Sequence, residues 1–294
     1  MEIFVQLVLT GIMVGSIYAL VALGWVLIYK CSGVLNMAMG ELTLIGAYVS
    51  LTFYGWGFPF PIALLATLLI GTVLGILTER IFLRRLIGEP VLTIIMVTVG
   101  LSFFFRGVIE LIWGTDTRVF HPPVFPYEPI RLGPVVIGQV YLWSFLAALA
   151  LLGILVAFFR YTRWGLAMQA MADDEMAAMS LGISPKFVYA AAWAIAFMAA
   201  GVGGSLLGNI NGVNISVGYL GLLVLPAVVL GGLNSIPGAI LGGIIIGVLQ
   251  NLAGGYLDRF TPGGVKEIFP FLVMTLVLLI KPYGLFGWVR IERV

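Results

Sequence analysis

Three ionisable residues interrupt long apolar stretches and have the greatest capacity for chemistry: Glu41, Arg106 and Glu110. An ionisable group in hydrocarbon is costly unless it faces a polar path or a partner charge. Glu41 either faces a polar pathway or pairs with a neighbouring helix. Arg106 and Glu110 are four residues apart, so they can share a helix face, and we interpret them as a structural pair.

The residue types give little support for covalent or metal-assisted catalysis. The chain has one cysteine, Cys31, and one histidine, His121, which lies in a Pro-rich loop. A catalytic nucleophile with its base, or a metal cluster, needs more such groups. The net charge of +2 and the scattered Lys and Arg residues do not indicate a nucleic-acid surface. We expect no catalytic residue, no metal site and no nucleic-acid partner.

The elements that position these residues are expected to be membrane helices. Hydrophobic residues make up 61% of the 294 positions and charged residues only 10%, whereas a soluble domain carries about a quarter charged residues. The apolar residues fall in runs of about 20, which is long enough to cross a bilayer. We predict an all-α, polytopic transmembrane helical bundle of about eight to ten spans, forming a single domain over residues 1–294. The predicted spans are 5–29, 34–54, 60–80, 91–113, 140–160, 187–208, 218–232, 238–255 and 268–282.

Basic residues between the spans predict the orientation. An outer N-terminus places most Lys and Arg residues on the cytoplasmic side, as the positive-inside rule requires. We therefore predict N-out and C-in, with an outer loop at about 114–139 and a cytoplasmic loop at about 160–186. The seventh and eighth spans can alternatively form a broken, partly re-entrant pair, because Pro226 and Pro237 interrupt them. Several Gly-x-x-x-Gly pairs favour close helix packing within one bundle.

The cytoplasmic loop contains a segment that favours a helix. Ala and Met dominate Trp164–Leu181, and Gly182 can supply a left-handed turn that ends this helix. Ser184 and Pro185 suit the start of the next span. Met and Ala residues with an acidic edge, Asp173 to Glu175, suit docking to a partner protein. We predict a short cytoplasmic coupling helix.

An external motor is expected to drive this helix. The nucleotide-binding motif Gly-x-x-x-x-Gly-Lys-Ser/Thr is absent from the sequence, so ATP hydrolysis must come from another polypeptide. An ion-coupled secondary transporter is an alternative, although it would place more ionisable groups in broken helices. A membrane-embedded enzyme and a structural scaffold are further alternatives.

The sequence resembles the permease subunits of bacterial ABC importers for branched-chain amino acids, over nearly its whole length. The segments that carry the resemblance are Gly15–Gly24, Asn36–Glu41, Gly46–Tyr48, the coupling segment, and Val229–Ala239 with the glycines that follow. The resemblance implies an inner-membrane location, a second permease subunit that is identical or different, two ATP-binding cassette subunits and a periplasmic binding protein. ATP and Mg²⁺ would bind those partner subunits and no cofactor would bind this chain.

The resemblance also assigns roles to residues. It implies that the ATPase-coupling residues are Gly165, Ala170, Asp173, Asp174, Ala177 and Gly182. The candidate translocation path consists of Asn36, Glu41, Gly231, Gly232 and Ser235. Family members often carry charged or titratable groups where this chain has Met39, Gln169, Leu223 and Gln250. These departures leave the cargo open between branched-chain amino acids, related amino acids, and urea, amides or other small solutes.

Overall fold

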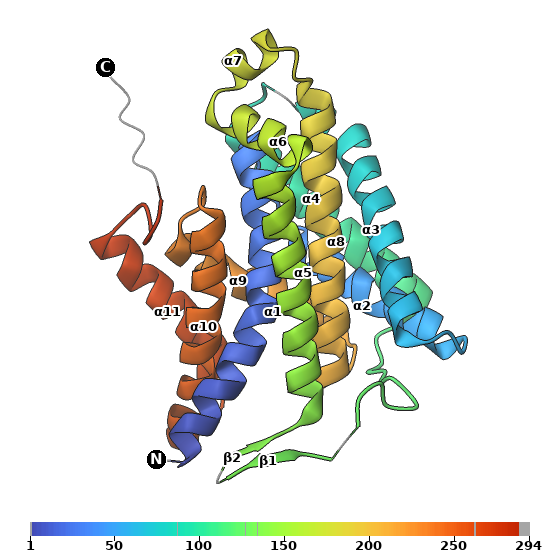
Figure 1. Ribbon diagram of the computed structural model, residues 1–294, viewed down its shortest axis with the longest axis vertical. Coiled ribbons are helices and arrows are strands. Elements are labelled where there is room, and N and C mark those ends of the chain that lie inside the picture. The colour runs from blue at the N-terminus through green and yellow to red at the C-terminus, as the bar shows by residue number, and fades with distance from the viewer. Residues whose placement is uncertain (1, 87, 127, 134, 262, 288–294) are drawn as a thin grey trace.

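A computed structural model of the chain describes residues 2–86, 88–126, 128–133, 135–261 and 263–287. The chain forms a bundle of helices, most of them running along its long axis (Figure 1). Six helices of the described part are long and apolar enough to cross a membrane. They are α1 (Glu2–Ser32), α3 (Phe60–Ile81, extended by the 3-10 helix η1, Leu83–Leu86), α4 (Val91–Trp113), α5 (Gln139–Tyr161), α8 (Pro185–Asn211) and α10 (Ile236–Leu257). The predicted polytopic helical bundle is confirmed.

The other three predicted spans correspond to helices of 17 residues or fewer. They are α2 (Met39–Gly55), α9 (Leu220–Gly231, preceded by the 3-10 helix η2, Ile215–Tyr219) and α11 (Val265–Ile280). The 12 residues of α9 extend for only about 18 Å, compared with about 30 Å of hydrocarbon in a bilayer. Pro226 lies inside α9, and Gly232 ends it with a φ of +102°. The seventh predicted span is therefore a short helix, whereas the eighth contains α10, a continuous helix of 22 residues.

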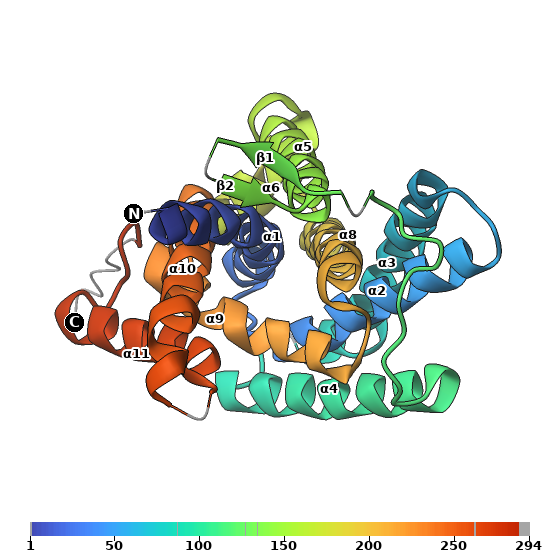
Figure 2. The same cartoon turned by 90° about the horizontal axis from the view of Figure 1, so that it is seen from below.

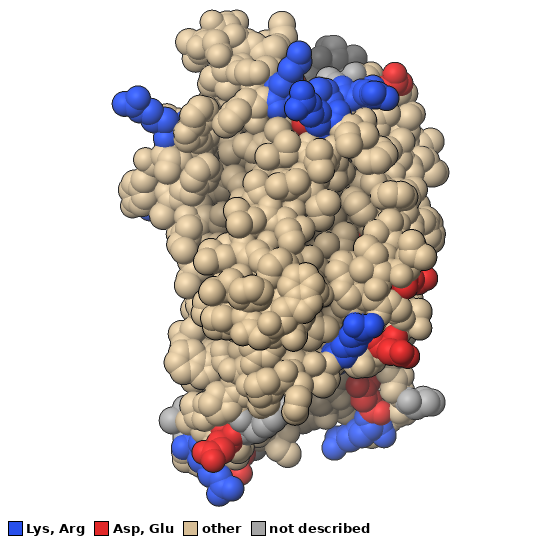
Figure 3. Space-filling model, turned by 90° about the vertical axis from the view of Figure 1, so that its right-hand side faces the viewer, with Lys and Arg blue, Asp and Glu red and all other residues tan. Residues whose placement is uncertain are grey.

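The two long loops lie at opposite ends of the bundle (Figure 1). The first carries an antiparallel pair of short strands, β1 (Ile130–Leu132) and β2 (Val135–Ile137). The second carries α6 (Arg163–Asp173) and α7 (Glu175–Ser180). We call these two ends the hairpin end and the α6/α7 end. Charged side chains gather near the ends, and a broad uncharged surface lies between them on the face in Figure 3.

The predicted single coupling helix is wrong, because the segment forms two helices. Asp174 adopts an extended conformation, with φ −151° and ψ 103°, and separates α6 from α7. Its Oδ1 accepts a hydrogen bond from the Ala177 N–H at 3.0 Å and caps α7. A short polar side chain that caps the next helix competes with continued helix, and here the cap prevails.

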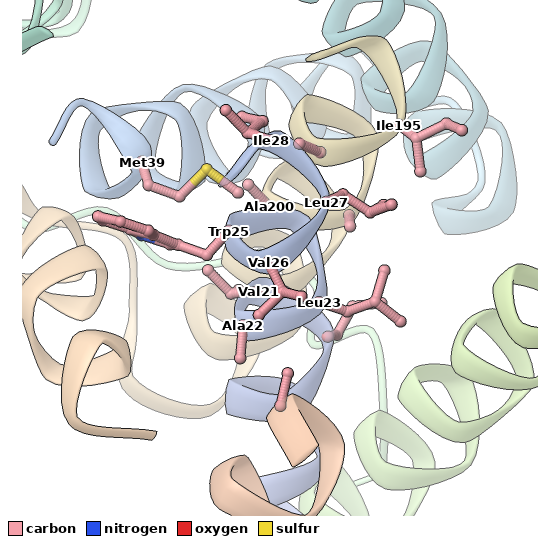
Figure 4. Packing of buried hydrophobic residues seen from close by; sticks show 14 of the residues in the cluster. Val21, Ala22, Leu23, Trp25, Val26, Leu27, Ile28, Met39, Ile195 and Ala200 are labelled. Carbon is pink, nitrogen blue, oxygen red and sulfur yellow. The ribbon is translucent and has the colours of Figure 1, made fainter. Parts of the chain in front are cut away.

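The centre of the bundle is built around α1, which lies among α5, α8 and α10 in the view from the hairpin end (Figure 2). Its residues from Ile17 to Ile28 are buried, and Figure 4 shows them packed against Met39, Ile195 and Ala200.

Glycines let the central helices approach closely. A Cβ atom on Gly247 would collide with Gly15, and one on Gly46 would collide with Gly201. These contacts join α1 to α10 and α2 to α8 within the same chain, so the prediction of close packing inside one bundle is confirmed.

Candidate functional site

The chain enters α2 through a non-helical segment that turns back into the bundle. After α1 ends at Ser32, residues 33–38 form no helix, and the side chain of Met39 then lies against Gly24. Gly24 is eight residues before the end of α1, which corresponds to about 12 Å of helix. The start of α2 therefore lies deep within the bundle. Non-helical backbone at such depth is tolerated only where protein or a polar cavity surrounds it.

Polar side chains hold this re-entrant segment in place. Asn36 is fully buried, and its Oδ1 accepts a hydrogen bond from the Ala38 N–H at 3.0 Å. Thr98 of α4 donates its hydroxyl hydrogen to the Leu35 carbonyl at 3.1 Å. Asn36, a predicted path residue, therefore stabilises the local backbone that positions the first turn of α2.

Glu41 lies in that first turn and pairs with Arg106 of α4. The Glu41 Oε1 and Arg106 Nη2 atoms are 3.0 Å apart, and the Glu41 residue is 5% exposed. The interpretation that Arg106 pairs with Glu110 is wrong. Glu110 is exposed, whereas Glu41 is buried in apolar surroundings and has the stronger need for a cation. Of the two alternatives given for Glu41, pairing with a neighbouring helix is the one observed.

The same ion pair borders the junction between α2 and η2. Arg106 also lies over the ring of Tyr219, 5.4 Å from its centroid. Gly218 lies beneath the pair, because a Cβ atom on it would come within 3.3 Å of Arg106 Nη2. A Cβ atom on Gly40 would collide with the Gly218 carbonyl, so the two segments touch through their backbones. The starts of α2 and α9 thus meet at one charged, glycine-rich centre inside the bundle.

Paired broken helices of this kind suit the handling of a polar solute. Helix N-termini carry partial positive charge and free N–H groups, and transporters with discontinuous helices use such ends at their binding sites. The Nε of Arg106 is buried and has no hydrogen-bond partner among the described residues. We call Asn36, Glu41, Arg106 and Gly218 the polar centre.

The other predicted path residues lie elsewhere. Gly231, Gly232 and Ser235 form the turn between α9 and α10, at the far end of α9 and about 18 Å along it from the polar centre. The Ser235 Oγ accepts a hydrogen bond from the Gly238 N–H and caps α10. The Gly231 carbonyl accepts one from the Phe286 N–H at 3.1 Å. The structure therefore does not bring all five predicted path residues together, and these three form a closed backbone turn.

Two of the predicted coupling residues position α6. Gly165 packs α6 against the end of α5, since a Cβ atom on it would collide with the Phe158 carbonyl. Ala170 is half-buried, and Asp173 forms an ion pair with Lys30 at the end of α1, with 3.4 Å between Oδ1 and Nζ. Asp173 thus contacts its own chain.

The end of α7 follows the sequence prediction closely. Gly182 has a φ of +83°, its N–H donates to the Met179 carbonyl, and the Ile183 N–H donates to the Ala178 carbonyl. These two hydrogen bonds form a Schellman motif. The next helix, α8, has Ser184 at its N-cap position and begins at Pro185, as predicted.

Further contacts tie α6 and α7 to α8. The Tyr189 hydroxyl donates a hydrogen bond to Glu175 Oε1 at 2.7 Å. The rings of Trp164 and Phe187 have centroids 4.6 Å apart. These contacts attach α6 and α7 directly to the start of a membrane-spanning helix.

The free surface of these two helices combines apolar side chains with the predicted acidic edge, because Asp173, Asp174 and Glu175 are exposed. The exposed large side chains are Trp164, Leu166, Met176, Met179 and Leu181. Ala177, the remaining predicted coupling residue, is exposed on the same segment. A cluster of exposed apolar side chains on a protruding segment is typical of a protein interface.

Glu79 is a further buried carboxylate, at the end of α3. The residue is 1% exposed. Its two carboxylate oxygens accept hydrogen bonds from Arg84 at 3.1 and 2.8 Å. Arg84 also donates to the Lys186 carbonyl, so the pair joins the end of α3 to the start of α8.

Residues at which the chain departs from the resembling family are uncharged and mostly enclosed. Met39 and Gln250 are buried, and Leu223 is half-buried. Gln169 donates a hydrogen bond to the Phe159 carbonyl at 3.1 Å. Each of them fits its surroundings without a charge.

Comparison with known proteins identifies relatives along the whole chain. The family model described as "Branched-chain amino acid transport system / permease component" matches residues 7–278. The high-affinity branched-chain amino acid transport system permease protein LivH of Salmonella typhimurium is 34% identical, over 99% of this chain and 98% of that protein. The permease protein BraD of Pseudomonas aeruginosa is 30% identical over the same shares.

A solved structure also resembles this fold. PsaBC from Streptococcus pneumoniae, in complex with Fab, aligns with a TM-score of 0.50 and 15% sequence identity, over 95% of this chain and 91% of the other. At this identity the likeness concerns the fold alone. Because a family model matches most of the chain and relatives match it from end to end, the chain belongs to the family of branched-chain amino acid transport system permease components.

Proposed function

We propose that this chain is the transmembrane permease subunit of an ATP-binding cassette importer in a bacterial inner membrane, and that it translocates branched-chain or related amino acids. The observation that carries the proposal is the end-to-end similarity to LivH and BraD, whose names state this cargo class. The multi-pass helical bundle and the polar centre inside it agree with a transport role.

The proposed orientation places the α6/α7 end in the cytoplasm. That end contains the C-terminal ends of α1, α3 and α5 and the start of α8. The basic residues there are Lys30, Arg80, Arg84, Arg85, Arg160, Arg163 and Lys186. Such an excess of Lys and Arg favours the cytoplasmic side of a membrane. The N-terminus and the β1–β2 hairpin then face outward, where a periplasmic binding protein delivers the cargo.

The proposed partners are two ATP-binding cassette subunits, a second permease subunit and the binding protein. The exposed apolar side chains of α6 and α7 would dock into the ATPase subunits, which would bind ATP and Mg²⁺ and perform the hydrolysis. The Asp173–Lys30 and Glu175–Tyr189 contacts would pass the resulting movement to α1 and α8. ATP binding would supply the free-energy difference between the states open to each side.

The proposed cargo site is the polar centre. It contains a carboxylate, a guanidinium group with an unpartnered N–H, and two helix starts, all enclosed by apolar helices. A polar solute that opens the Glu41–Arg106 contact gains partners for its own charges. The turn at Gly231, Gly232 and Ser235 would act as a hinge between α9 and α10.

The decisive experiment is uptake by the complete complex. The chain is co-purified with its partner subunits, reconstituted into vesicles with internal ATP and supplied with binding protein and radiolabelled leucine. We expect ATP-dependent uptake that unlabelled isoleucine and valine inhibit and urea does not. Uptake that follows an ion gradient without ATP would overturn the transport mechanism, and inhibition by urea alone would overturn the cargo class.

A further inference from the structure

A cavity of about 520 Å³ lies at the hairpin end, away from the polar centre and the coupling helices. It is formed where α2 and α4 end and where the following loop passes over them. The lining residues that matter below are Thr52, Trp56, Ile112, Trp113, Arg118 and His121. The function proposed above does not use this cavity.

Hydrogen bonds and stacking make its back wall rigid. The Trp113 indole N–H donates to the Thr52 hydroxyl at 2.9 Å, and its ring stacks on Tyr48 with centroids 5.2 Å apart. The Tyr48 hydroxyl is buried and has no hydrogen-bond partner among the described residues. Two helices are thereby held together at the level where both end.

Arg118 is fixed at the rim of the same cavity. Its Nη2 donates to the Trp113 carbonyl at 2.6 Å, and its backbone pairs with Val213 after α8, with N–H to carbonyl distances of 2.9 and 2.7 Å. A guanidinium group has five N–H donors, so this single side-chain contact leaves others free. No carboxylate is among the described residues that line the cavity.

Exposed apolar side chains border the mouth of the cavity. Ile112 is 60% exposed on a membrane-spanning helix, and Trp56 is 68% exposed at the end of α2. Trp side chains favour the boundary between headgroups and acyl chains. The cavity therefore combines an apolar mouth beside an exposed Trp with a cationic rim, a composition that suits the membrane interface whichever side of the membrane this end faces.

We propose that this cavity binds the headgroup of an anionic phospholipid. The free N–H groups of Arg118 contact the lipid phosphate, and His121 adds a hydrogen-bond donor beside it. One acyl chain lies along Ile112 and Val119, and Trp56 packs beside the glycerol region. Because no carboxylate lines the cavity to receive an ammonium group, a phosphatidylglycerol headgroup fits better than a phosphatidylethanolamine headgroup.

Native mass spectrometry of the purified full chain tests this inference. The protein is titrated in detergent with phosphatidylglycerol, phosphatidylethanolamine or free glycerol phosphate. We expect phosphatidylglycerol to bind most tightly, and Arg118→Gln to weaken it by about fivefold, the change that corresponds to one Arg at an anionic surface. The matched control, Arg131→Gln, removes a cation from the same loop outside the cavity and should leave binding unchanged.

Several results would overturn the inference. Equal binding of both lipids, equal effects of the two Arg substitutions, or binding of free glycerol phosphate as tight as that of the lipid would each contradict a lipid headgroup site. If Arg118→Gln does not fold, Arg118→Lys keeps the charge and loses the planar fork, and His121→Gln removes the second donor. Unchanged phosphatidylglycerol binding in both of these variants also contradicts the proposal. None of these measurements depends on transport.

Discussion

Glu41 on α2 and Arg106 on α4 form an ion pair that joins the start of a short, buried helix to a long apolar helix that is mostly exposed. Glu41 is almost fully enclosed, whereas the Arg106 side chain is 26% exposed. A buried carboxylate without its cation carries a large desolvation penalty. The pair therefore stabilises the polar centre. Loss of the pair can be measured as a loss of protein stability.

Neutralising one residue of the Glu41–Arg106 pair should destabilise the protein more than neutralising both. We expect Arg106→Gln to cost about 3 kcal/mol, at the low end for a buried pair because the arginine is partly exposed. The double variant Glu41→Gln with Arg106→Gln should regain most of this loss. Thermal unfolding midpoints in detergent measure both effects. Glu110→Gln is the control, and a loss equal to that of Arg106→Gln would contradict the observed pairing.

Substitution of Ala for a Gly at a close helix contact should destabilise the protein. Gly46→Ala places a Cβ atom against the Gly201 backbone of α8, and backbone atoms cannot move aside, so we expect a loss of about 3 kcal/mol. Gly100→Ala on α4 is the matched control, because a Cβ atom there meets no neighbour within 4 Å. This variant should be neutral or more stable by about 0.5–1 kcal/mol. Similar unfolding midpoints for the two variants would argue against close contact of α2 and α8.

The left-handed turn at Gly182 should matter for coupling. Valine at a φ of +83° costs about 1–2 kcal/mol and opens the Schellman motif that joins α7 to α8. In the reconstituted complex, we expect Gly182→Val to lower uptake per ATP hydrolysed. Gly182→Asn, which tolerates the left-handed conformation, should retain more coupling. Equal ratios of uptake to ATP hydrolysis in the two variants would remove this turn from the coupling mechanism.

The contact between α7 and α8 can be tested without disturbing their packing. Tyr189→Phe removes only the hydroxyl that donates to Glu175, a hydrogen bond worth about 1 kcal/mol. We expect stimulation of ATP hydrolysis by the binding protein to fall about fivefold at most. Tyr161→Phe removes an exposed hydroxyl from the end of α5 and is the control. Unchanged stimulation of ATP hydrolysis in Tyr189→Phe would show that this hydrogen bond does not contribute to coupling.

Local chemistry predicted the ends of several elements correctly. Gly182, Ser184 and Pro185 each occupy the cap position that their conformational preferences indicate. The sequence predicted a break before α2, but it could not show that residues 34–38 are non-helical, because Val34 and Leu35 continue the apolar run and hydropathy does not distinguish a helix from an enclosed non-helical segment. In the folded chain, Asn36 and Thr98 satisfy two backbone groups of this segment.

The candidate site could be predicted only in part, because its residues come from segments that lie far apart in the sequence. Helix periodicity identifies residues that share a face, so it offered Glu110 as the partner of Arg106. The actual partner, Glu41, lies on another helix, and only the folded bundle brings it within 3.0 Å. Similarly, Gly231 and Glu41 both lie in segments that resemble the family, but Gly231 ends α9, whereas Glu41 lies on α2 beside the other end of α9.

The hydrogen bond from Ser205 to the Gly46 carbonyl joins positions 159 residues apart. A ribosome therefore synthesises α2 long before its packing partner α8 exists. At 17 residues, α2 is also shorter than a usual membrane span. During biogenesis this segment must wait in the insertion machinery or at the bilayer surface, and it enters its final position only after more than two thirds of the chain has been translated.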